Sequence, residues 1–337
     1  MNLLLTSVGR RSYLVRYFKE VIGEGGVICA ANSSDLSPAF AAADRTVVTP
    51  LIYDDHYIPF LLDYCKKENI QVLLSLFDID LPILSRHKAE FAAQGVQVIV
   101  SDPEVIDVCN DKLLMSIFLR ERDFATPDCY LSVEEAKEAV EEGSLCYPVM
   151  IKPRWGMGSL SIYQADNEEE LEVFYQKIKR EIERSYLKYE SEADLEHAVL
   201  IQQRIGGQEY GLDVIQDLNH IYQTTIVKEK IAMRSGETDC ARVVELPNLR
   251  ELGAKIGSEL GHIANLDMDI ILSDGIPYII DMNARFGGGY PYSHMAGVNL
   301  PRVILDWVRG QKADPTDLCA ETGKLYGKDI VMTELGR

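Results

Sequence analysis

The sequence predicts a protein of mixed class, in which an α/β domain with a parallel sheet precedes an α+β region with antiparallel sheets. In the first part, short apolar runs such as NLLLT and QVLLSL alternate with segments of helical period, and strands that alternate with helices form parallel sheets covered on both faces. In the second part, paired apolar runs flank glycine-bearing turns, and the Asp-Gly of LDMDIILSDGIPYIIDMN is a hairpin signal. The 337 residues, 47% of them hydrophobic, can bury more than one core.

Composition excludes several classes of partner. The formal net charge of -19 argues against a nucleic-acid or anionic-membrane surface, because both require clustered Lys and Arg. The apolar run in MNLLLTSVGRR is too short for a signal peptide, and no stretch approaches the length of a membrane span. The seven cysteines form no CxxC pair and are expected to be reduced thiols. We therefore expect a cytoplasmic protein that holds its ligands in local pockets.

The first domain is expected at about residues 1–105. Its first helix follows NLLLT, with Leu14, Phe18 and Val21 on one face. Ligands usually bind at the carboxyl ends of such strands, which draws attention to the loops TSVGRR and SLFDID. The three-glycine dinucleotide fingerprint is absent. The charged residues of these loops, which either contact a substrate or are solvated, are Arg10, Arg11, Asp78 and Asp80.

A second region begins after one amphipathic helix and a Thr-Pro turn. The segment LCYPVMIKPRWGMGSLSIYQAD predicts two antiparallel strands joined by a flexible loop. A long helix follows, with dense charge opposite its apolar stripe, and the charge is expected to face solvent. The stripe consists of Leu171, Phe174, Ile178 and Ile182.

The segment IIDMNARFGGG carries the strongest chemical signal. Strand alternation places Asp281, Asn283 and Arg285 on one face of an otherwise apolar strand. The Asp-Gly turn folds Asp269 of the preceding strand back toward them. Two carboxylates and an amide oxygen suit Mg²⁺ when water or phosphate oxygens fill the other positions. The alternative is a hairpin whose polar face only meets solvent.

Two further segments carry weaker signals. In KPRWGMGSLS, Lys152 ends a buried strand, and Gly156 and Gly158 allow the backbone to approach an anion. The spacing is not that of a Walker loop, and such a hairpin alone does not establish nucleotide binding. Lys112, in a DK pair, can reach a phosphate, although most such lysines lie on the surface.

Taken together, the series DK, YPVMIKPRWGMGS, IQQRIGGQEYGLDV and DMDIILSDGIPYIIDMNARFGGG resembles the ATP-grasp superfamily, and within it the carbamoyl-phosphate synthase large subunit. The resemblance covers essentially the whole chain. It implies a pre-ATP-grasp, Rossmann-like domain at 1–105 and a two-lobed ATP-grasp domain at 106–310. Within the latter, the small lid lobe is expected at about 125–203. The segment 311–337 is left without a role.

The resemblance also implies roles for individual residues, with ATP and Mg²⁺ or Mn²⁺, one or two ions, as cofactors. It places two lysines on the phosphates, a glycine loop over them, a hinge against adenine and an acid on the ribose. The implied nucleotide contacts are Lys112, Lys152, Gly156, Gly158, Ser159, Gln202, Gln203, Ile205 and Glu209. The implied metal ligands are Asp269, Asp281 and Asn283. The implied catalytic residues are Arg285, Asn283, Lys228 and Arg234. Of these, Lys228 and Arg234 are expected near the acceptor substrate.

Two positions depart from the superfamily pattern. Gln202 stands where many relatives have a glutamate that accepts from the adenine amino group, so that hydrogen bond would lack charge assistance. Asp281 stands where glutamate is commoner, and its shorter side chain leaves the number of metal ions open.

The predicted function is an ATP-dependent carboxylate–amine (or thiol) ligase that works through an acyl phosphate and releases ADP and phosphate. In such a site, positioning and electrostatics supply the catalysis. The alternatives are phosphorylation of the carboxyphosphate or carbamate type, as in carbamoyl-phosphate synthase, and a nucleotide-binding regulatory module without turnover. The expected partners are small-molecule carboxylates and amines, without nucleic acid or membrane, and a homodimer is allowed.

Overall fold

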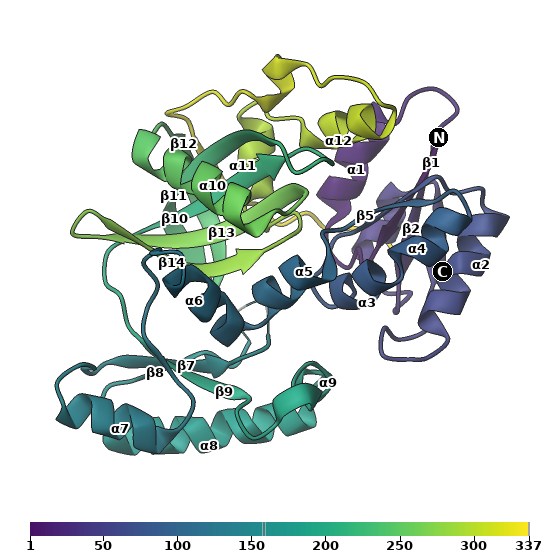
Figure 1. The fold of residues 1–337 in the computed structure, drawn as a ribbon. Coiled ribbons are helices and arrows are strands. Elements are labelled where there is room, and N and C mark those ends of the chain that lie inside the picture. Colours follow the sequence, from purple (N-terminus) through teal and green to yellow (C-terminus); the bar gives the residue numbers. More distant parts are fainter. Residues whose placement is uncertain (157, 159, 336–337) are drawn as a thin grey trace.

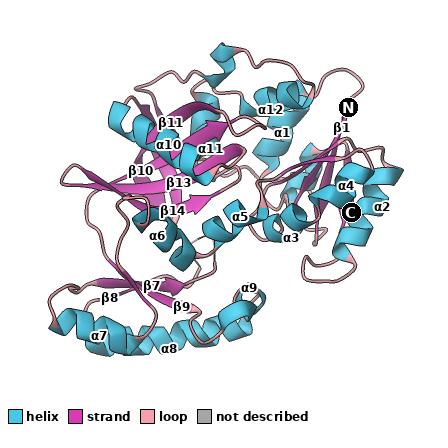
Figure 2. Cartoon of the chain, in the orientation of Figure 1, coloured by secondary structure: helices cyan, strands magenta, loops and turns pink. Residues whose placement is uncertain are grey.

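A computed structural model of the chain describes residues 1–156, 158 and 160–335, and their strands form three sheets (Figures 1 and 2). One is a parallel sheet near the N-terminus, and two are antiparallel sheets that belong to a small and a large lobe. This arrangement confirms the predicted fold class. Among the described residues, no helix is both long enough and apolar enough to cross a membrane.

The N-terminal sheet is parallel throughout, in the order β3-β2-β1-β4-β5. Its strands are β1 Asn2–Thr6, β2 Val27–Asn32, β3 Arg45–Val48, β4 Val72–Ser75 and β5 Gln97–Ile99. Its helices are α1 Ser12–Val21, α2 Tyr57–Lys67, α3 Leu81–Arg86 and α4 Lys88–Ala93. The strand order reverses between β1 and β4, which makes the gap beyond their carboxyl ends a topological switch point.

Two helices connect this sheet to the rest of the molecule. They are α5 Pro103–Asn110 and α6 Lys112–Arg120, and both contact β14 of the large sheet (Figure 1). Asp111 ends α5 in an extended conformation and caps α6 by accepting from the amides of Leu113 and Leu114. The cap fixes the point at which Lys112 enters α6.

The small lobe is a four-stranded sheet with helices on one face, in the order β6-β9-β7-β8. Its strands are β6 Cys129–Tyr130, β7 Val149–Pro153, β8 Tyr163–Ala165 and β9 Val199–Gln203, and its helices are α7 Val133–Glu141, α8 Glu168–Arg184 and α9 Leu187–Glu190. Alternate residues such as Ile151 and Ile201 join the apolar core under α7 and α8. The residues between them, including Lys152 and Gln202, therefore point to the opposite face.

The large lobe is a six-stranded sheet in the order β14-β13-β10-β11-β12-β15. Its strands are β10 Gln208–Gln216, β11 Tyr222–Arg234, β12 Glu237–Val244, β13 Ala264–Ser273, β14 Ile276–Asn283 and β15 Leu325–Gly327. Its helices are α10 Pro247–Leu260, α11 Tyr290–Met295 and α12 Leu300–Val308. One face buries Leu212, Met268 and Met282 in an apolar cluster shared with α10. The other face is polar.

The C-terminal segment does not form a separate domain in this structure. After α12, the chain adds β15 to the edge of the large sheet by pairing with β12. The predicted divisions at residues 105, 125, 203 and 310 remain predictions, and the first of them falls within α5.

Candidate functional site

The polar face of the large sheet gathers oxygen donors from neighbouring strands. The register of β13 and β14 places Asp269 opposite Asp281 and Asp267 opposite Asn283. The Asn283 amide donates to Asp281 Oδ2 at 3.2 Å. Burial raises the pKa of Asp269, and the charges of Asp267 and Asp281 act in the same direction. The strands thus bring together the three predicted metal ligands, with Asp267 as a fourth oxygen donor.

This donor set fits Mg²⁺, because carboxylate and amide oxygens are the ligands this ion prefers. Within the described ranges, no group of three or more His, Cys, Asp or Glu side chains is arranged to hold a metal ion by itself. An ion bound at Asp269, Asp281 and Asn283 would therefore take its other ligands from water and phosphate oxygens, as Mg²⁺ commonly does.

The cations on the same face are paired with acids. Lys230 Nζ lies 2.7 Å from Asp269 Oδ1 and 3.8 Å from Glu209 Oε2. Lys228 Nζ lies 2.5 Å from Asp213 Oδ2. Each of these two lysines is therefore paired with an acid before any ligand binds.

Arg285 joins the large sheet to the N-terminal domain. Its guanidinium lies 2.8 Å from Asp78 Oδ1 and 2.7 Å from Asp267 Oδ2. Burial alone would lower the pKa of Arg285, but the two carboxylates outweigh it and raise that pKa. Gly287, the first glycine of the run, cannot be replaced by a residue with a side chain without a shift, because its Cβ would lie 2.1 Å from Asp267 Cγ.

Lys152 faces this cluster from the small lobe. It is 5% exposed, and its ammonium makes no hydrogen bond or ion pair with any residue that the structure describes. Burial and the charge of Lys112 lower the pKa of Lys152 to about 8, whereas Asp281 and Asp269 oppose the shift. Charges of the small lobe and of the large lobe therefore act on one another.

The predicted glycine loop folds against the start of α6. The Lys112 amide donates to the Arg154 carbonyl at 3.3 Å, and Lys112 Nζ donates to the Gly156 carbonyl at 2.5 Å. Arg154 is in turn paired with Asp111 at 2.6 Å. Gly158 has φ +64°, a conformation that favours glycine. The DK pair and the KPRWG segment are thus brought together, while the predicted contact from Ser159 lies outside the described residues.

The predicted adenine hinge lies at the end of β9. Gln202 is buried and donates to Cys129 Sγ at 3.4 Å. The Gln203 amide donates to the Asp128 carbonyl at 2.8 Å. Ile205 is half-buried in the link to β10, and Glu209 is the second residue of that strand, opposite Ile271. These four residues lie along the connection between the two lobes, as a hinge requires, and their contacts with a nucleotide stay predictions.

The two predicted acceptor contacts lie in different surroundings. Lys228 is 2% exposed, and Asp213, which it pairs with, also accepts from Ser293 of α11. Lys228 is thus held in a buried ion pair, and its predicted role near an acceptor stays a prediction. Arg234 lies at the tip of the β11–β12 hairpin, mostly exposed and 2.9 Å from Asp239.

Sequence reasoning missed Lys230 and Asp267. Lys230 stands two positions after Lys228, so strand alternation places both on the polar face. Asp267 stands two positions before Asp269 for the same reason. The alternation of KEK and DMD indicates that both lysines and both aspartates lie on this face. It does not indicate which residue of each pair is the more accessible.

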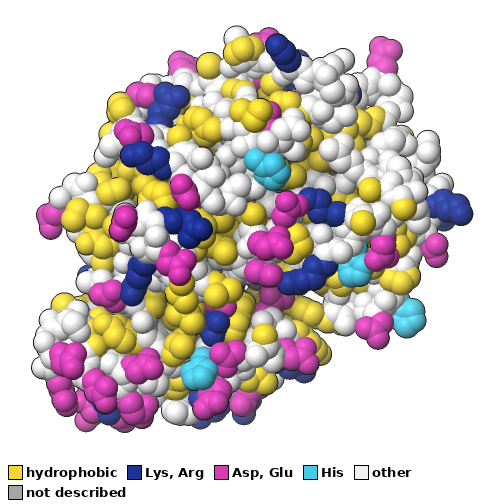
Figure 3. All heavy atoms as spheres, in the orientation of Figure 1, with side chains coloured by type: hydrophobic (Ala, Val, Ile, Leu, Met, Phe, Trp, Pro, Cys, Tyr) yellow, Lys and Arg dark blue, Asp and Glu magenta, His cyan; other side chains and the backbone are white. Residues whose placement is uncertain are grey.

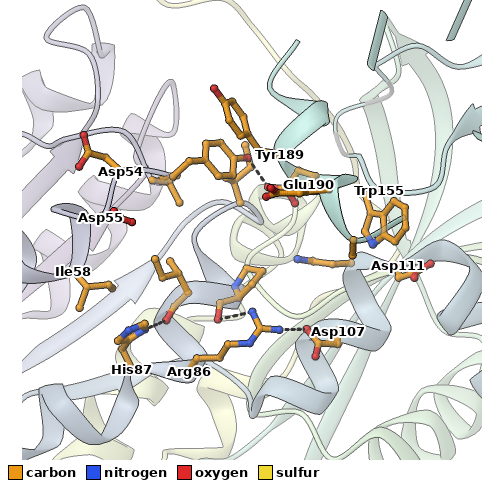
Figure 4. Close-up of a pocket in the computed structure, with 18 of the residues that line it drawn as sticks. Asp54, Asp55, Ile58, Arg86, His87, Asp107, Asp111, Trp155, Tyr189 and Glu190 are labelled. Carbon is orange, nitrogen blue, oxygen red and sulfur yellow. Dashed lines mark hydrogen bonds and ion pairs between the residues drawn. The ribbon is translucent and has the colours of Figure 1, made fainter. Parts of the chain in front are cut away.

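The space-filling view shows Lys, Arg, Asp and Glu side chains along the junction between the small lobe and the rest of the molecule (Figure 3). A cavity of about 1190 Å³ lies beside this junction, between the N-terminal domain and the small lobe (Figure 4). Asp54, Arg86 and Glu190 are among its lining residues. Lys152, Asp269 and Asp281 are not, so this cavity is distinct from the oxygen cluster.

Comparison with known protein families gives two matches. A family model described as the ATP-grasp domain matches residues 109–289, more than half of the chain. A second, described as the N-terminal domain of PylC-like proteins, matches residues 3–99. These matches confirm the superfamily resemblance drawn from the four motifs.

Individual relatives are distant. The carbamoyl phosphate synthase large chain of Corynebacterium glutamicum is 24% identical over 295 residues, which cover 84% of this chain. The chain spans about a quarter of that relative's length, 25%. The biotin carboxylase domain of the Hydrogenobacter thermophilus 2-oxoglutarate carboxylase, solved with MgADP and bicarbonate, matches with TM-score 0.73 at 18% identity, covering 96% of this chain and 73% of that one. An L-amino acid ligase from Bacillus licheniformis matches with TM-score 0.65 at 18% identity, covering 91% and 74%.

Proposed function

The chain belongs to the ATP-grasp family, and on that premise we propose that it is an ATP-dependent ligase that joins a carboxylate to an amine and releases ADP and phosphate. The observation that carries the proposal is the unpaired, buried Lys152 of the small lobe, which interacts electrostatically with Asp281 and Asp269 of the large lobe. A buried cation without a partner among the described residues, together with oxygen donors from the other lobe, suits a triphosphate with its metal ion.

The roles of the side chains follow from their charges. Lys152 and Lys112 would hold phosphate oxygens, and Asp269, Asp281 and Asn283 would hold Mg²⁺. When bound, the ion would neutralise phosphate charge that otherwise repels an incoming carboxylate. Arg285, fixed by Asp78 and Asp267, would lie beside the transferred phosphoryl group.

The reaction needs no covalent enzyme intermediate. A carboxylate oxygen of the substrate attacks the γ-phosphorus, and the bond to the ADP oxygen breaks. The amine nitrogen then attacks the carbonyl carbon of the acyl phosphate, phosphate leaves, and the amine loses a proton to solvent. The part of the protein is to position the two substrates and stabilise the developing charge.

The experiment is an ADP-release assay with pooled small carboxylates and amines, followed by a label test on any active pair. A carboxylate labelled with ¹⁸O should transfer one labelled oxygen to the released phosphate. The proposal is overturned if AMP is released in place of ADP, if the released phosphate carries no label, or if no pool causes ADP release. Lys152→Met serves as the control that separates this activity from contaminating ATPase.

A second candidate is phosphorylation of bicarbonate or carbamate. It is favoured by the matches to a carbamoyl phosphate synthase chain and to a biotin carboxylase domain that was solved with bicarbonate. ADP release that requires bicarbonate but no other carboxylate would select this alternative over the first.

A further inference from the structure

A thiol and an amide side chain are hydrogen-bonded to one another on the small-lobe sheet. Cys129 of β6 lies opposite Gln202 of β9 in the antiparallel register. Gln202 is 3% exposed, and its Nε2 donates to Cys129 Sγ at 3.4 Å. Cys129 is half-buried, and its Sγ donates to the Pro127 carbonyl at 3.5 Å. The two bonds form a short chain from the amide through the thiol to the backbone.

This pair lies on the side of Lys152 that is away from the glycine loop. Gln202 is opposite Met150 of β7, and Lys152 follows two residues later, about 6–7 Å further along the strand on the same face. The glycine loop begins after Pro153, where β7 ends. A nucleotide whose phosphates are held by Lys152 and the loop would therefore extend its base toward Gln202 and Cys129.

The oxygen of the Gln202 amide has no donor. Oε1 accepts from no residue that the structure describes, although the side chain is almost fully buried. A buried acceptor without a donor is costly, so this oxygen suits a ligand that presents an N–H group. The 6-amino group of adenine is such a donor, whereas the 6-oxo group of hypoxanthine or guanine is an acceptor.

The orientation of this amide decides which base it can pair with. A carboxylate can only accept, but a glutamine can turn either its oxygen or its NH₂ group toward a base. In the observed orientation the thiol donates to Pro127 and accepts from Gln202, so both hydrogen bonds are made. In the reverse orientation Oε1 would face the sulfur, and the thiol could donate to it only by giving up the Pro127 carbonyl.

We propose that Cys129 is a positioning residue, which holds the Gln202 amide with its oxygen toward the base and thereby favours adenine over a 6-oxopurine. This inference rests on the proposed function, because it requires that an adenine nucleotide binds beside Lys152. Base preference then depends on two side chains, whereas a glutamate in place of Gln202 sets it alone.

The test compares MgADP with MgIDP, because hypoxanthine carries a 6-oxo group where adenine carries its amino group. Calorimetry with the full chain measures both dissociation constants, and their ratio is the readout. The wild-type protein should bind MgADP about 5- to 150-fold more tightly than MgIDP, as expected when a buried acceptor is left without a donor. A variant that is only destabilised would bind both nucleotides less tightly and leave this ratio unchanged.

Removal of the thiol should lower the ratio. Cys129→Ala and Cys129→Val remove the sulfur acceptor, so the Gln202 amide can turn its NH₂ group toward a 6-oxo group. The preference for MgADP should then fall by roughly 2- to 10-fold, as expected for the loss of one neutral hydrogen bond. Cys129→Ser keeps a donor and an acceptor at this position, and its ratio should stay within about twofold of the wild type.

A second cysteine provides the matched control. Cys319 also donates to a proline carbonyl, that of Pro315 at 3.2 Å, but it is exposed in the C-terminal segment. Cys319→Ala should change the ratio by less than about twofold, as is usual for a surface substitution. A fall of the ratio in Cys129→Ala alone would therefore be due to the place of this thiol beside Gln202.

A carboxylate in place of the amide tests the orientation directly. Gln202→Glu presents only acceptors, so its preference for MgADP should be at least that of the wild type. Adding Cys129→Ala to Gln202→Glu should change the ratio by less than about twofold, because no amide is left to orient.

The outcomes distinguish this inference from the proposed function. The inference is overturned if the wild-type protein binds MgADP and MgIDP equally or if neither Cys129→Ala nor Cys129→Val lowers the ratio. It is also overturned if Cys129→Ala lowers the ratio as much in the Gln202→Glu background as in the wild type. Failure of the wild-type protein to bind either nucleotide would instead overturn the proposed function, on which this inference rests.

Discussion

The cations of the large sheet and of the small lobe differ in whether they are paired with acids. On the large sheet, Lys228, Lys230 and Arg285 each lie within 2.8 Å of a carboxylate oxygen. On the small lobe, Lys152 is also buried but has no partner among the described side chains, and Lys112 at the start of α6 contacts a backbone carbonyl. Each of these three cations thus has an acidic partner within the protein, whereas Lys152 has none among the described side chains.

This difference separates structural charge from functional charge. A buried ion pair can be tolerated because its partners compensate one another, while a buried charge without a partner is costly. A fold retains such a charge where a ligand compensates it. We therefore expect the paired cations to govern stability and geometry, and the unpaired lysine to govern the affinity for phosphate.

The largest expected effect comes from breaking a pair on the large sheet. Lys228→Met would leave Asp213 buried and charged, which should lower the stability of the folded protein by about 3–5 kcal/mol. Chemical denaturation of the wild-type protein and of the Lys228→Met variant measures this difference in the free energy of unfolding. Lys324→Met, which breaks an exposed pair with Glu321, should cost less than about 1 kcal/mol. Similar losses in the two variants would contradict the structural role of Lys228.

The next effect concerns the unpaired side. Lys152→Met should reduce kcat/KM for ATP by ~10²–10³-fold, because it removes one preorganised contact with the phosphates. Its stability should not fall, since a buried ammonium without a partner is replaced by an apolar side chain of similar length. A variant that is destabilised but still fully active would show that Lys152 is structural.

A smaller effect is expected at Arg285, where the comparison can be sharpened. Arg285→Lys keeps the charge but loses the fork that reaches both Asp78 and Asp267, which should reduce kcat by about 10- to 150-fold. MgADP affinity should change by less than about threefold, and Arg302→Lys, at an exposed pair, is the control. An equal loss of MgADP affinity would place Arg285 among the nucleotide contacts.

The smallest effect is a dependence on pH. The pKa of Lys152 is lowered to about 8, so its ammonium is largely present at pH 7 and is lost as the pH rises through 8. If the charged form binds ATP, the Kd should increase about tenfold between pH 7 and pH 9. Lys152→Met should show no such increase. If the Kd for ATP changed equally with pH in the wild type and in Lys152→Met, the titrating group would be a different residue.

Much of the fold could be predicted because it depends on local patterns. The alternation of apolar runs and helices predicts the N-terminal sheet, and the Asp-Gly turn predicts the β13–β14 hairpin that brings Asp269 opposite Asp281. The chain order of four short motifs was sufficient for the family. The roles of Lys228 and Lys230 could not be separated, because alternation places both on one face and does not indicate depth.

The sequence by itself determined the class of fold, the family and the faces on which charged residues lie, because these follow from spacing along a strand or helix. Tertiary structure alone decided which charges are paired. Asp78 and Arg285 are separated by 207 positions, and Lys228 and Asp213 meet only because β10 and β11 are adjacent. Electrostatic pairing depends on distance in space and on burial, and neither quantity is encoded in local sequence patterns.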